Sequence, residues 1–328
     1  MKILITRTIK SALLDNIPKE FEVVMWKEED SPMPRAELLR EIEDADAVFT
    51  NVSDQIDFEV FERAKNLKVV GTMAVGFDNI NVQEATKRGI LVGHTPDVLS
   101  EAVAELALAL MFATARRVVE GMNYIQQNQW ESWGPYLFAG QKISGKKLGI
   151  IGMGRIGKIL AKMARGINME VLYSNRRRDE QTEAELNVDY RDLESLLKES
   201  DYVVMLAPAT PETYHMLGYE QFALMKPTSI FVNVSRGSTV NEDDLYKILS
   251  EKKIFAAGLD VFEVEPIKNN HPLLTLDNVI AVPHIGSATV DTRDKMVEIT
   301  LNNILRGLKG ERLLHTVNKE VYELSTRK

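Results

Sequence analysis

Three ionisable residues, Arg236, Glu265 and His284, each follow an apolar run with the length and composition of a buried strand. An imidazole such as that of His284 can both give and take a proton near neutral pH. A carboxylate can orient the ring and favour its protonated form, and a guanidinium presents a planar pair of donors to a carboxylate. An acid, its orienting group and an anion clamp, facing a hydride donor, would reduce a 2-oxo acid. The alternative is that Arg236 and Glu265 form a structural ion pair.

A hydride donor could bind at the stretch K-L-G-I-I-G-M-G-R-I-G, residues 147–157. An apolar run leads into Gly152, Gly154 and Gly157, and an amphipathic segment follows, which is the strand, turn and helix order of a dinucleotide site. The three glycines would permit a tight turn, a close approach to the pyrophosphate and close packing of the helix on the strand. The phosphates would lie at the helix N-terminus. The alternative is a structural glycine turn.

The identity of the dinucleotide depends on the residues after the next predicted strand, 170–174. An NAD site typically has Asp or Glu at this strand end, where it binds the ribose. This chain has Asn175, Arg176, Arg177 and Arg178 instead. Positive charge without a carboxylate favours the 2′-phosphate of NADP, because guanidinium groups pair with phosphate. We therefore expect NADPH, with NADH as the alternative cofactor and a solvated basic turn as the alternative explanation.

The elements that position these residues follow a regular alternation. Short β-rich runs alternate with helical patterns along the first hundred residues and again from 147 to 282. This predicts two doubly wound parallel-sheet α/β domains, with functional sites beyond the carboxyl ends of the strands. At one such end, in 72–78, small residues would expose N–H groups that could bind an anion, although a plain turn is the commoner explanation.

Between the two alternating regions we expect one long helix over 101–128, capped by Ser100. Its face from Leu106 to Ala115 is apolar almost all round, which implies burial between layers or between subunits. The aromatic loop at 130–138 would form an interface or cover the edge of the domain. Further along, Asn241 is expected to cap a helix over 242–250.

The composition excludes several classes of function. The 328 residues are enough for two domains, and the absence of cysteine excludes disulfides, thiolate nucleophiles and cysteine-based metal sites. The net charge is −8 and no long basic run is present, so we expect no nucleic-acid surface. The apolar run at the N-terminus is too short for a signal-peptide core, and the longest apolar stretch, 102–115, is interrupted by Glu105 and shorter than a membrane span. The sequence thus predicts a soluble, cytoplasmic protein with no membrane partner.

No metal site is expected either. Four histidines have no partner that the pattern can identify, and we expect surface or packing roles for them: His94, His215, His271 and His315.

Four motifs in order resemble the D-isomer-specific 2-hydroxyacid dehydrogenase family. They are G-M-G-R-I-G at 152–157, N-V-S-R-G at 233–237, G-L-D-V-F-E-V-E-P at 258–266 and P-H-I-G-S-A-T at 283–289. The resemblance extends over nearly the whole chain, including 73–80 and 94–105. Within the family the chain looks most like the glyoxylate/hydroxypyruvate reductases and the related 2-ketogluconate reductases.

The resemblance implies a role for each matching residue. Arg236 would bind the substrate carboxylate and carbonyl, and His284 would be the acid in reduction and the base in oxidation. Glu265, rather than Glu263, would be the partner of His284, because it precedes the proline. The backbone N–H groups of Val75 and Gly76 would bind the carboxylate, and Asp260 would meet the nicotinamide carboxamide. The expected cofactor contacts are Gly152, Gly154, Arg155, Ile156, Gly157, Asn175, Arg176, Arg177, Pro208, Thr213, Val234, Asp260, His284 and Gly286.

The resemblance also implies the domain organisation. A flavodoxin-like substrate-binding domain would comprise residues 1–99 and, after a return of the chain, 287–328, with an NAD(P)-binding Rossmann domain inserted at 100–286. Family members are usually homodimers through the long helix and the loop after it. The expected activity is NADPH-preferring reduction of glyoxylate, hydroxypyruvate and, as a further candidate, 2-ketogluconate to D-2-hydroxy acids. The alternatives are an NAD-dependent dehydrogenase of other specificity and a non-enzymatic NAD(H)-sensing scaffold.

Overall fold

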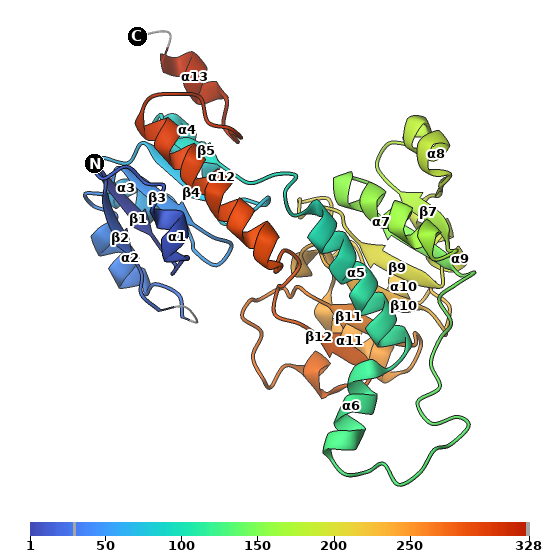
Figure 1. The fold of residues 1–328 in the computed structure, drawn as a ribbon. Helices are drawn as coiled ribbons and strands as arrows, with labels where there is room; N and C mark the ends of the chain where they lie inside the picture. The colour runs from blue at the N-terminus through green and yellow to red at the C-terminus, as the bar shows by residue number, and fades with distance from the viewer. Residues whose placement is uncertain (29–30, 326–328) are drawn as a thin grey trace. The chain divides into compact units, whose positions relative to one another are not determined.

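The computed structural model describes residues 1–28 and 31–325 (Figure 1). The chain forms two compact units, one made of residues 1–99 with the segment from 289 onward, the other of residues 100–288. Each unit contains one parallel β-sheet covered by helices on both faces, so the prediction of two doubly wound parallel-sheet domains is confirmed.

The first unit has a five-stranded sheet in the order β2-β1-β3-β4-β5, which is the flavodoxin-like order. Its strands are β1 (Lys2–Ile5), β2 (Glu22–Met25), β3 (Ala47–Thr50), β4 (Val69–Thr72) and β5 (Leu91–Gly93). Side chains alternate between the faces, so Leu4 packs on one side while Ile3 and Ile5 pack on the other. The covering helices are α1 (Ser11–Leu14), α2 (Arg35–Glu41), α3 (Phe58–Arg63), α4 (Val82–Lys87), α12 (Val290–Leu308) and α13 (Glu320–Ser325).

Helix α12 brings a late part of the chain back onto the first sheet, where it packs against β3, β4 and β5 (Figure 1). Its apolar residues Val297, Leu301 and Ile304 join the core cluster of Ile3 and Ile5. The helix begins at Val290, and the side chain of Thr289 accepts a hydrogen bond from the Thr292 N–H at its N-terminus.

The second unit has a seven-stranded sheet in the order β12-β11-β10-β9-β6-β7-β8. Its strands are β6 (Lys147–Ile151), β7 (Glu170–Ser174), β8 (Asp189–Tyr190), β9 (Tyr202–Met205), β10 (Ile230–Asn233), β11 (Ala256–Leu259) and β12 (Val279–Ala281). The direction of winding reverses between β6 and β9, and in doubly wound sheets ligands bind at such a switch point. The glycine-rich stretch follows β6 directly.

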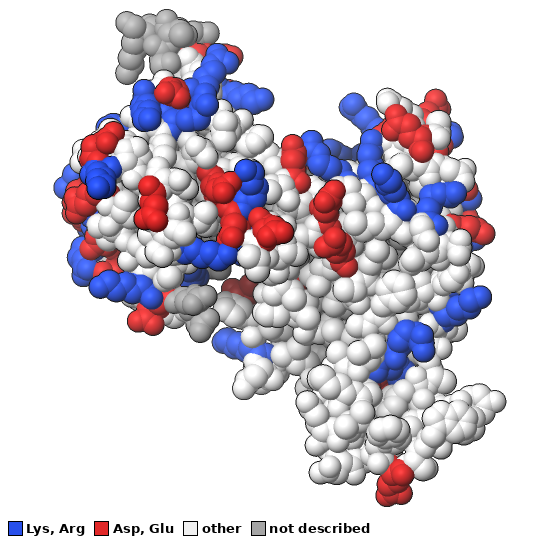
Figure 2. Space-filling view, in the orientation of Figure 1, with Lys and Arg blue, Asp and Glu red and all other residues white. Residues whose placement is uncertain are grey.

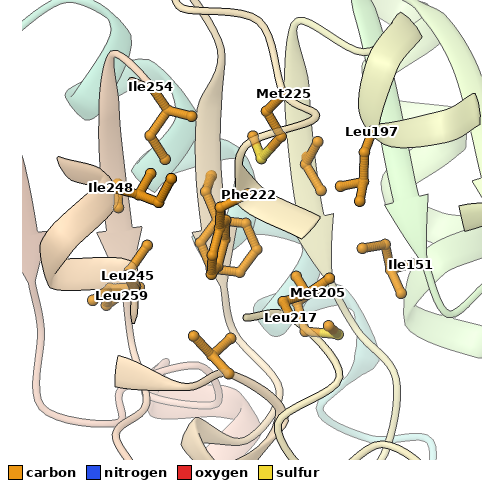
Figure 3. Packing of buried hydrophobic residues seen from close by; sticks show 14 of the residues in the cluster. Ile151, Leu197, Met205, Leu217, Phe222, Met225, Leu245, Ile248, Ile254 and Leu259 are labelled. Atoms are coloured by element: carbon orange, nitrogen blue, oxygen red, sulfur yellow. The ribbon is translucent and has the colours of Figure 1, made fainter. Parts of the chain in front are cut away.

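Helices cover both faces of this second sheet. They are α5 (Ser100–Ala115), α7 (Arg155–Gly166), α8 (Glu180–Leu186), α9 (Leu193–Glu199), α10 (Tyr219–Phe222) and α11 (Glu242–Ser250). A further helix, α6 (Val118–Gln126), packs on the end of α5 and has no buried residue. Helices α9, α10 and α11 enclose a core in which the rings of Phe222 and Phe231 meet edge to face at 5.1 Å between centroids. Figure 3 shows Phe222 at the centre of this cluster, between Met205 and Leu259. Asn241 caps α11 by accepting the Asp244 N–H at 3.1 Å, as predicted.

The prediction of one long helix over 101–128 is wrong. Helix α5 ends at Ala115, and α6 begins at Val118. Arg117 between them has a left-handed backbone with φ of 52°, which breaks the helix. Its guanidinium pairs with Glu120 at 2.6 Å and lies 4.9 Å from the centre of the Phe138 ring. Tertiary contacts of one side chain therefore stabilise a break that the apolar pattern does not reveal.

The N-terminus of α5 also differs from the prediction, because Ser100 is the first helical residue and not the cap before it. Helix α5 packs against α7 and against β10, β11 and β12, so its apolar face is buried between layers of this unit. Gly258 of β11 allows the close approach, since a Cβ there would lie 3.0 Å from the Thr114 hydroxyl. Within residues 1–28 and 31–325, every helix is too short or too polar to span a bilayer.

Candidate active site

The three glycines after β6 each meet a different physical requirement. Gly152 has φ of +101°, and a Cβ there would lie 2.6 Å from the Ala207 nitrogen in the loop after β9. At Gly157 a Cβ would lie 2.8 Å from the Gly152 carbonyl oxygen, so only glycine lets the first turn of α7 pack this close to β6. A Cβ on Gly154 would meet nothing within 4 Å. The space beside Gly154 therefore stays open for a ligand to approach the backbone.

The N-terminus of α7 suits an anion. Its N-cap residue is Gly154, which has no side chain to occupy the first N–H groups of the helix. Those groups and the helix dipole favour negative charge, as in the pyrophosphate sites of dinucleotide-binding proteins. The residues present thus fit a dinucleotide by two observations, the open cradle at Gly154 and the uncapped helix end.

The end of β7 is connected to this loop through Asn175. Its side-chain oxygen accepts a hydrogen bond from the Met153 N–H at 2.7 Å, which fixes the spacing between the two strand ends. The Arg178 guanidinium already donates two hydrogen bonds, of 2.8 and 2.9 Å, to the Glu183 carboxylate. Arg176 and Arg177 are exposed. Of the three consecutive arginines, these two are the candidates for a phosphate.

The loops after β9 and β10 lie at the same rim of the sheet. In the first, the Thr213 hydroxyl donates to the Pro208 carbonyl at 2.6 Å and accepts from the Thr210 N–H at 2.8 Å, which closes the loop on itself. In the second, Val234 is buried directly beyond β10. Both are positioned near the glycine turn because β9 pairs with β6 and β10 pairs with β9. Whether they contact the cofactor stays a prediction.

His284 and Glu265 lie together at this rim. The Nδ1 atom of His284 is 2.7 Å from the Glu265 Oε2, while Glu265 Oε1 accepts the Phe262 N–H at 2.9 Å. Partial burial opposes ionisation of Glu265, but the bonds from His284 and Phe262 and the nearby Arg236 outweigh it and lower the pKa of its carboxyl. An ionised Glu265 accepts a hydrogen bond from the protonated Nδ1 of His284, so the second ring nitrogen of His284 is left for other chemistry.

The turn that carries His284 is held by Asp260. His284 has a left-handed backbone with φ of 52°, and its N–H donates to the Asp260 carbonyl at 2.9 Å. The Asp260 carboxylate accepts the N–H groups of Ile285 at 2.6 Å and Gly286 at 2.9 Å. Burial raises the pKa of Asp260 in spite of these two donors. The family resemblance implied only a contact of Asp260 with the nicotinamide carboxamide, which stays a prediction, and it did not reveal this positioning role.

Arg236 lies on the segment after β10. Its backbone oxygen accepts from Asn233 at 3.0 Å, and one guanidinium nitrogen donates to the Ser235 carbonyl at 2.8 Å. The oxygens of Glu265 accept from the His284 ring and the Phe262 N–H. Glu265 therefore has His284 as its hydrogen-bond partner, rather than serving only in an ion pair with Arg236.

Two of the histidines for which the sequence pattern identified no partner have carboxylate partners in this unit. His215 Nε2 is 2.9 Å from Glu263, and its ring stacks on Tyr214 at 4.0 Å between centroids. His271 is 3.3 Å from Glu242. Glu263 and Glu265 thus have different histidine partners: Glu263 contacts His215, and Glu265 contacts His284. The contacts of His215 and His271 join residues up to 48 positions apart, so no local pattern could have shown them.

In the first unit, Val75 and Gly76 follow β4. The Ala74 carbonyl accepts the Thr95 N–H at 2.8 Å, and the Val75 carbonyl accepts from His94 Nδ1 at 3.1 Å. Within the described residues, the N–H groups of Val75 and Gly76 have no protein acceptor. In the same part of the chain, no group of three or more His, Asp or Glu side chains could hold a metal ion.

Comparisons with known proteins identify the family of this chain. The family model described as "D-isomer specific 2-hydroxyacid dehydrogenase, NAD binding domain" matches residues 108–286. A glyoxylate reductase of Pyrococcus furiosus is 47% identical over an alignment of 327 positions that covers 98% of this chain and 97% of the relative.

Two solved structures show the same fold over nearly the whole chain. A protein from Thermus thermophilus superposes with a TM-score of 0.91 and 41% identity, covering 97% of this chain and all of the other. An NADPH-dependent glyoxylate/hydroxypyruvate reductase from Sinorhizobium meliloti, solved with NADP and malonate, gives a TM-score of 0.84 at 28% identity and 96% coverage of both chains. The chain therefore belongs to the D-isomer specific 2-hydroxyacid dehydrogenase family of oxidoreductases.

Proposed function

We propose that this protein is an NADPH-preferring reductase that converts glyoxylate and hydroxypyruvate to D-2-hydroxy acids, with 2-ketogluconate as a further candidate substrate. The observation that carries the proposal is the 2.7 Å contact between His284 and Glu265 at the rim of the sheet that bears the glycine turn. The relative from Pyrococcus furiosus, a glyoxylate reductase, supports the substrate class. We assign cofactor binding to residues 100–286 and substrate binding to 1–99 with 287–328.

The chain's own residues would bind and protonate the substrate. The guanidinium of Arg236 holds the carboxylate and the carbonyl oxygen of the 2-oxo acid, and the N–H groups of Val75 and Gly76 bind the carboxylate. When bound, NADPH supplies the hydride that adds to C2. As the C=O bond becomes single, its electron pair moves to the oxygen, and His284 gives that oxygen its proton.

Glu265 prepares His284 for this step. Its ionised carboxylate holds the Nδ1 proton, so the imidazolium can give up the proton on its other nitrogen without rotating. Despite its burial, the hydrogen bonds from His284 and Phe262 lower the pKa of the Glu265 carboxyl, which favours the charged form of this partner. In the reverse direction the same ring takes the proton back as a base.

The cofactor preference rests on the end of β7. No carboxylate occupies position 175, where Asn175 bonds to the glycine loop, and Arg176 and Arg177 are exposed beside it. The Sinorhizobium meliloti relative was solved with NADP. We expect Arg176→Ala/Arg177→Ala to lower kcat/KM for NADPH by about 10- to 100-fold, the effect of losing charge-assisted bonds to phosphate, and to leave the value for NADH nearly unchanged.

A matched control is available in the neighbouring arginine. Arg178→Ala removes the same charge from the same turn, but Arg178 already pairs with Glu183. The ratio of kcat/KM for NADPH to that for NADH should stay near the wild-type value in this variant. A ratio that falls equally in both variants would show that only general positive charge is involved.

The activity itself is tested with the purified protein and a panel of glyoxylate, hydroxypyruvate and 2-ketogluconate, by NADPH oxidation and the configuration of the product. Arg236→Lys keeps the charge but loses the planar pair of N–H donors, so KM for the 2-oxo acid should rise while cofactor binding is unchanged. An equal loss of NADPH affinity would contradict the role of Arg236. Faster oxidation of D-2-hydroxy acids with NAD would favour the dehydrogenase alternative, and no turnover on any 2-oxo acid would favour the scaffold.

We also propose that the protein is a homodimer through α6 and the loop after it. The view in Figure 2 shows few charged side chains over this region. A groove of about 520 Å³ lined by Phe112, Arg116 and residues 139–144 lies beside it. The exposed apolar side chains of α6, the loop after it and the end of α5 are Phe112, Val118, Met122, Ile125, Trp130, Trp133, Tyr136 and Leu137.

Exposed apolar residues at this density indicate an interaction surface. Light scattering coupled to gel filtration should give the mass of a dimer for the wild type. Met122→Glu/Ile125→Glu places two charges in the interface and should give the mass of a monomer. A monomeric wild type would contradict the proposal.

A further inference from the structure

The loop after β4 has its carbonyl groups held from one side. The Thr95 N–H donates to the Ala74 carbonyl at 2.8 Å, and Nδ1 of His94 lies 3.1 Å from the Val75 carbonyl oxygen. A carbonyl can only accept a hydrogen bond, so His94 carries a proton on Nδ1. Two adjacent residues at the end of β5 thus bind two consecutive carbonyls of the neighbouring loop.

The planarity of the peptide unit turns this into a statement about the N–H groups. In a trans peptide the C=O of one residue and the N–H of the next point in opposite directions. The peptide that contains the Val75 carbonyl also contains the Gly76 N–H, and the peptide of the Ala74 carbonyl contains the Val75 N–H. With both carbonyls turned toward residues 94 and 95, both N–H groups point away from them. Two N–H groups on one side of a loop form a concave anion site.

His94 is itself fixed in place. Its N–H donates to the His315 carbonyl at 3.2 Å, and its carbonyl accepts from the Asn303 side chain at 3.1 Å. Asn303 is fully buried and also accepts the His315 N–H at 3.2 Å. The Phe77 ring packs edge to face on the imidazole at 5.8 Å between centroids. These contacts hold the imidazole with its Nδ1 atom facing the Val75 carbonyl.

The chemistry of the ring suits a fixed neutral donor. Burial is the main cause that lowers the pKa of His94, with His315 adding to it and the Val75 carbonyl opposing it. A neutral imidazole with Nδ1 protonated donates one hydrogen bond. The bond to the Val75 carbonyl also polarises the peptide, which strengthens the Gly76 N–H as a donor.

We propose that His94 is a positioning residue for the substrate carboxylate: by holding the Val75 carbonyl it aims the Gly76 N–H at the anion. The proposal rests on the proposed function of Val75 and Gly76 as the carboxylate-binding pair. It concerns ground-state and transition-state binding alike, so it predicts a change in KM for the 2-oxo acid and little change in kcat.

Two substitutions separate the hydrogen bond from the ring. His94→Phe keeps a ring for Phe77 to pack on and removes the donor, whereas His94→Asn loses the ring and keeps a donor on its side-chain nitrogen. We expect His94→Phe to raise KM for glyoxylate by about 3- to 10-fold, the range for one net hydrogen bond, with kcat and KM for NADPH close to wild type. His94→Asn should recover most of the loss.

His315→Ala is the matched control for ring packing, because the His315 ring meets the His94 ring edge to face at 6.4 Å between centroids, whereas the hydrogen bonds to the Ala74 and Val75 carbonyls come from Thr95 and His94. It should leave KM for glyoxylate unchanged. A wild-type KM in His94→Phe, or an impaired His94→Asn beside a normal His94→Phe, would overturn the proposal in favour of ring packing. If His94→Phe fails to fold, His94→Asn alone tests the proposal: a strongly raised KM for glyoxylate in His94→Asn would overturn it.

Direct binding of oxalate, measured by calorimetry with cofactor present, distinguishes this proposal from the proposed function. Oxalate offers a carboxylate but no reducible ketone. Weaker oxalate binding in His94→Phe supports the role of His94 even if no 2-oxo acid is turned over. Undiminished oxalate binding in His94→Phe, beside normal turnover by the wild type, overturns the role of His94 alone. A wild type that binds no oxalate overturns both.

Discussion

Replacing Gly237 by alanine tests how tightly the Arg236 segment packs against the loop that carries Glu265. Gly237 is buried, and a Cβ added there would lie 1.8 Å from the Phe262 carbonyl carbon and 2.1 Å from the Glu263 nitrogen. Both atoms belong to the backbone, so no side-chain rotation can relieve the overlap. Ordinary van der Waals contact begins at 3.4 Å.

The size of the effect follows from these distances. To reach 3.4 Å from 1.8 Å, the two segments must separate by about 1.6 Å. The Phe262 N–H holds Glu265, so a shift of this loop disturbs the 2.7 Å contact of Glu265 with His284. Misplacing a catalytic group by about 1 Å can cost roughly 10²-fold in rate. Overpacking of a buried site costs about 1–3 kcal/mol of stability.

The assay is steady-state reduction of glyoxylate together with thermal unfolding. Gly237→Ala should lower kcat by about 10²-fold or more and lower Tm by several degrees, at about 2–4 °C per kcal/mol. Gly166→Ala is the matched control: its Cβ meets nothing within 4 Å at the end of α7, so it should leave kcat unchanged and raise Tm slightly. Wild-type kcat and Tm in Gly237→Ala would refute the reasoning.

Two predictions concern stability. Asn241→Ala removes the cap of α11 and should cost about 1 kcal/mol, while Asn241→Asp should keep most of it; equal Tm values for Asn241→Ala and wild type would argue against the cap. Although burial opposes it, bonds from the Lys147 N–H and Lys226 lower the pKa of Asp201. Its stabilisation is therefore fully present above the ordinary value of 3.8 and is lost as the pH falls through the lower folded-state pKa. Asp201→Asn should lower Tm at pH 7, and the difference should shrink in acid; a constant difference across pH would contradict this.

The sequence predicted the features that depend on local backbone requirements. Gly152, Gly154 and Gly157 have the geometry expected for them because a turn, an open cradle and a close helix contact are all encoded within six residues. The placement of His284 at a strand end was likewise predictable, since the carboxyl ends of parallel strands share one rim.

Features that depend on distant partners could not be predicted. The apolar pattern of 101–128 continues through Arg117, so the break between α5 and α6 shows only when the contacts with Glu120 and Phe138 are known. Helix α8 and the two-residue strand β8 were not expected, because a polar segment of that length has no apolar periodicity.

The candidate site shows the same division. The choice of Glu265 over Glu263 came from the resemblance, and only the structure shows that Glu263 contacts His215 while Glu265 contacts His284. The bonds from Ile285 and Gly286 to Asp260 join residues more than 20 positions apart. Side-chain pairs at such separations depend on how the strands are arranged, which no local pattern contains.

The central claim is that His284, oriented by Glu265, donates the proton in reduction of a 2-oxo acid. The most direct measurement is kcat for glyoxylate with NADPH in wild type and in His284→Ala, with the dissociation constant for NADPH measured alongside. Loss of a positioned acid should lower kcat by about 10²–10⁴-fold with little change in cofactor binding. A His284→Ala variant that keeps near-wild-type kcat would contradict the account.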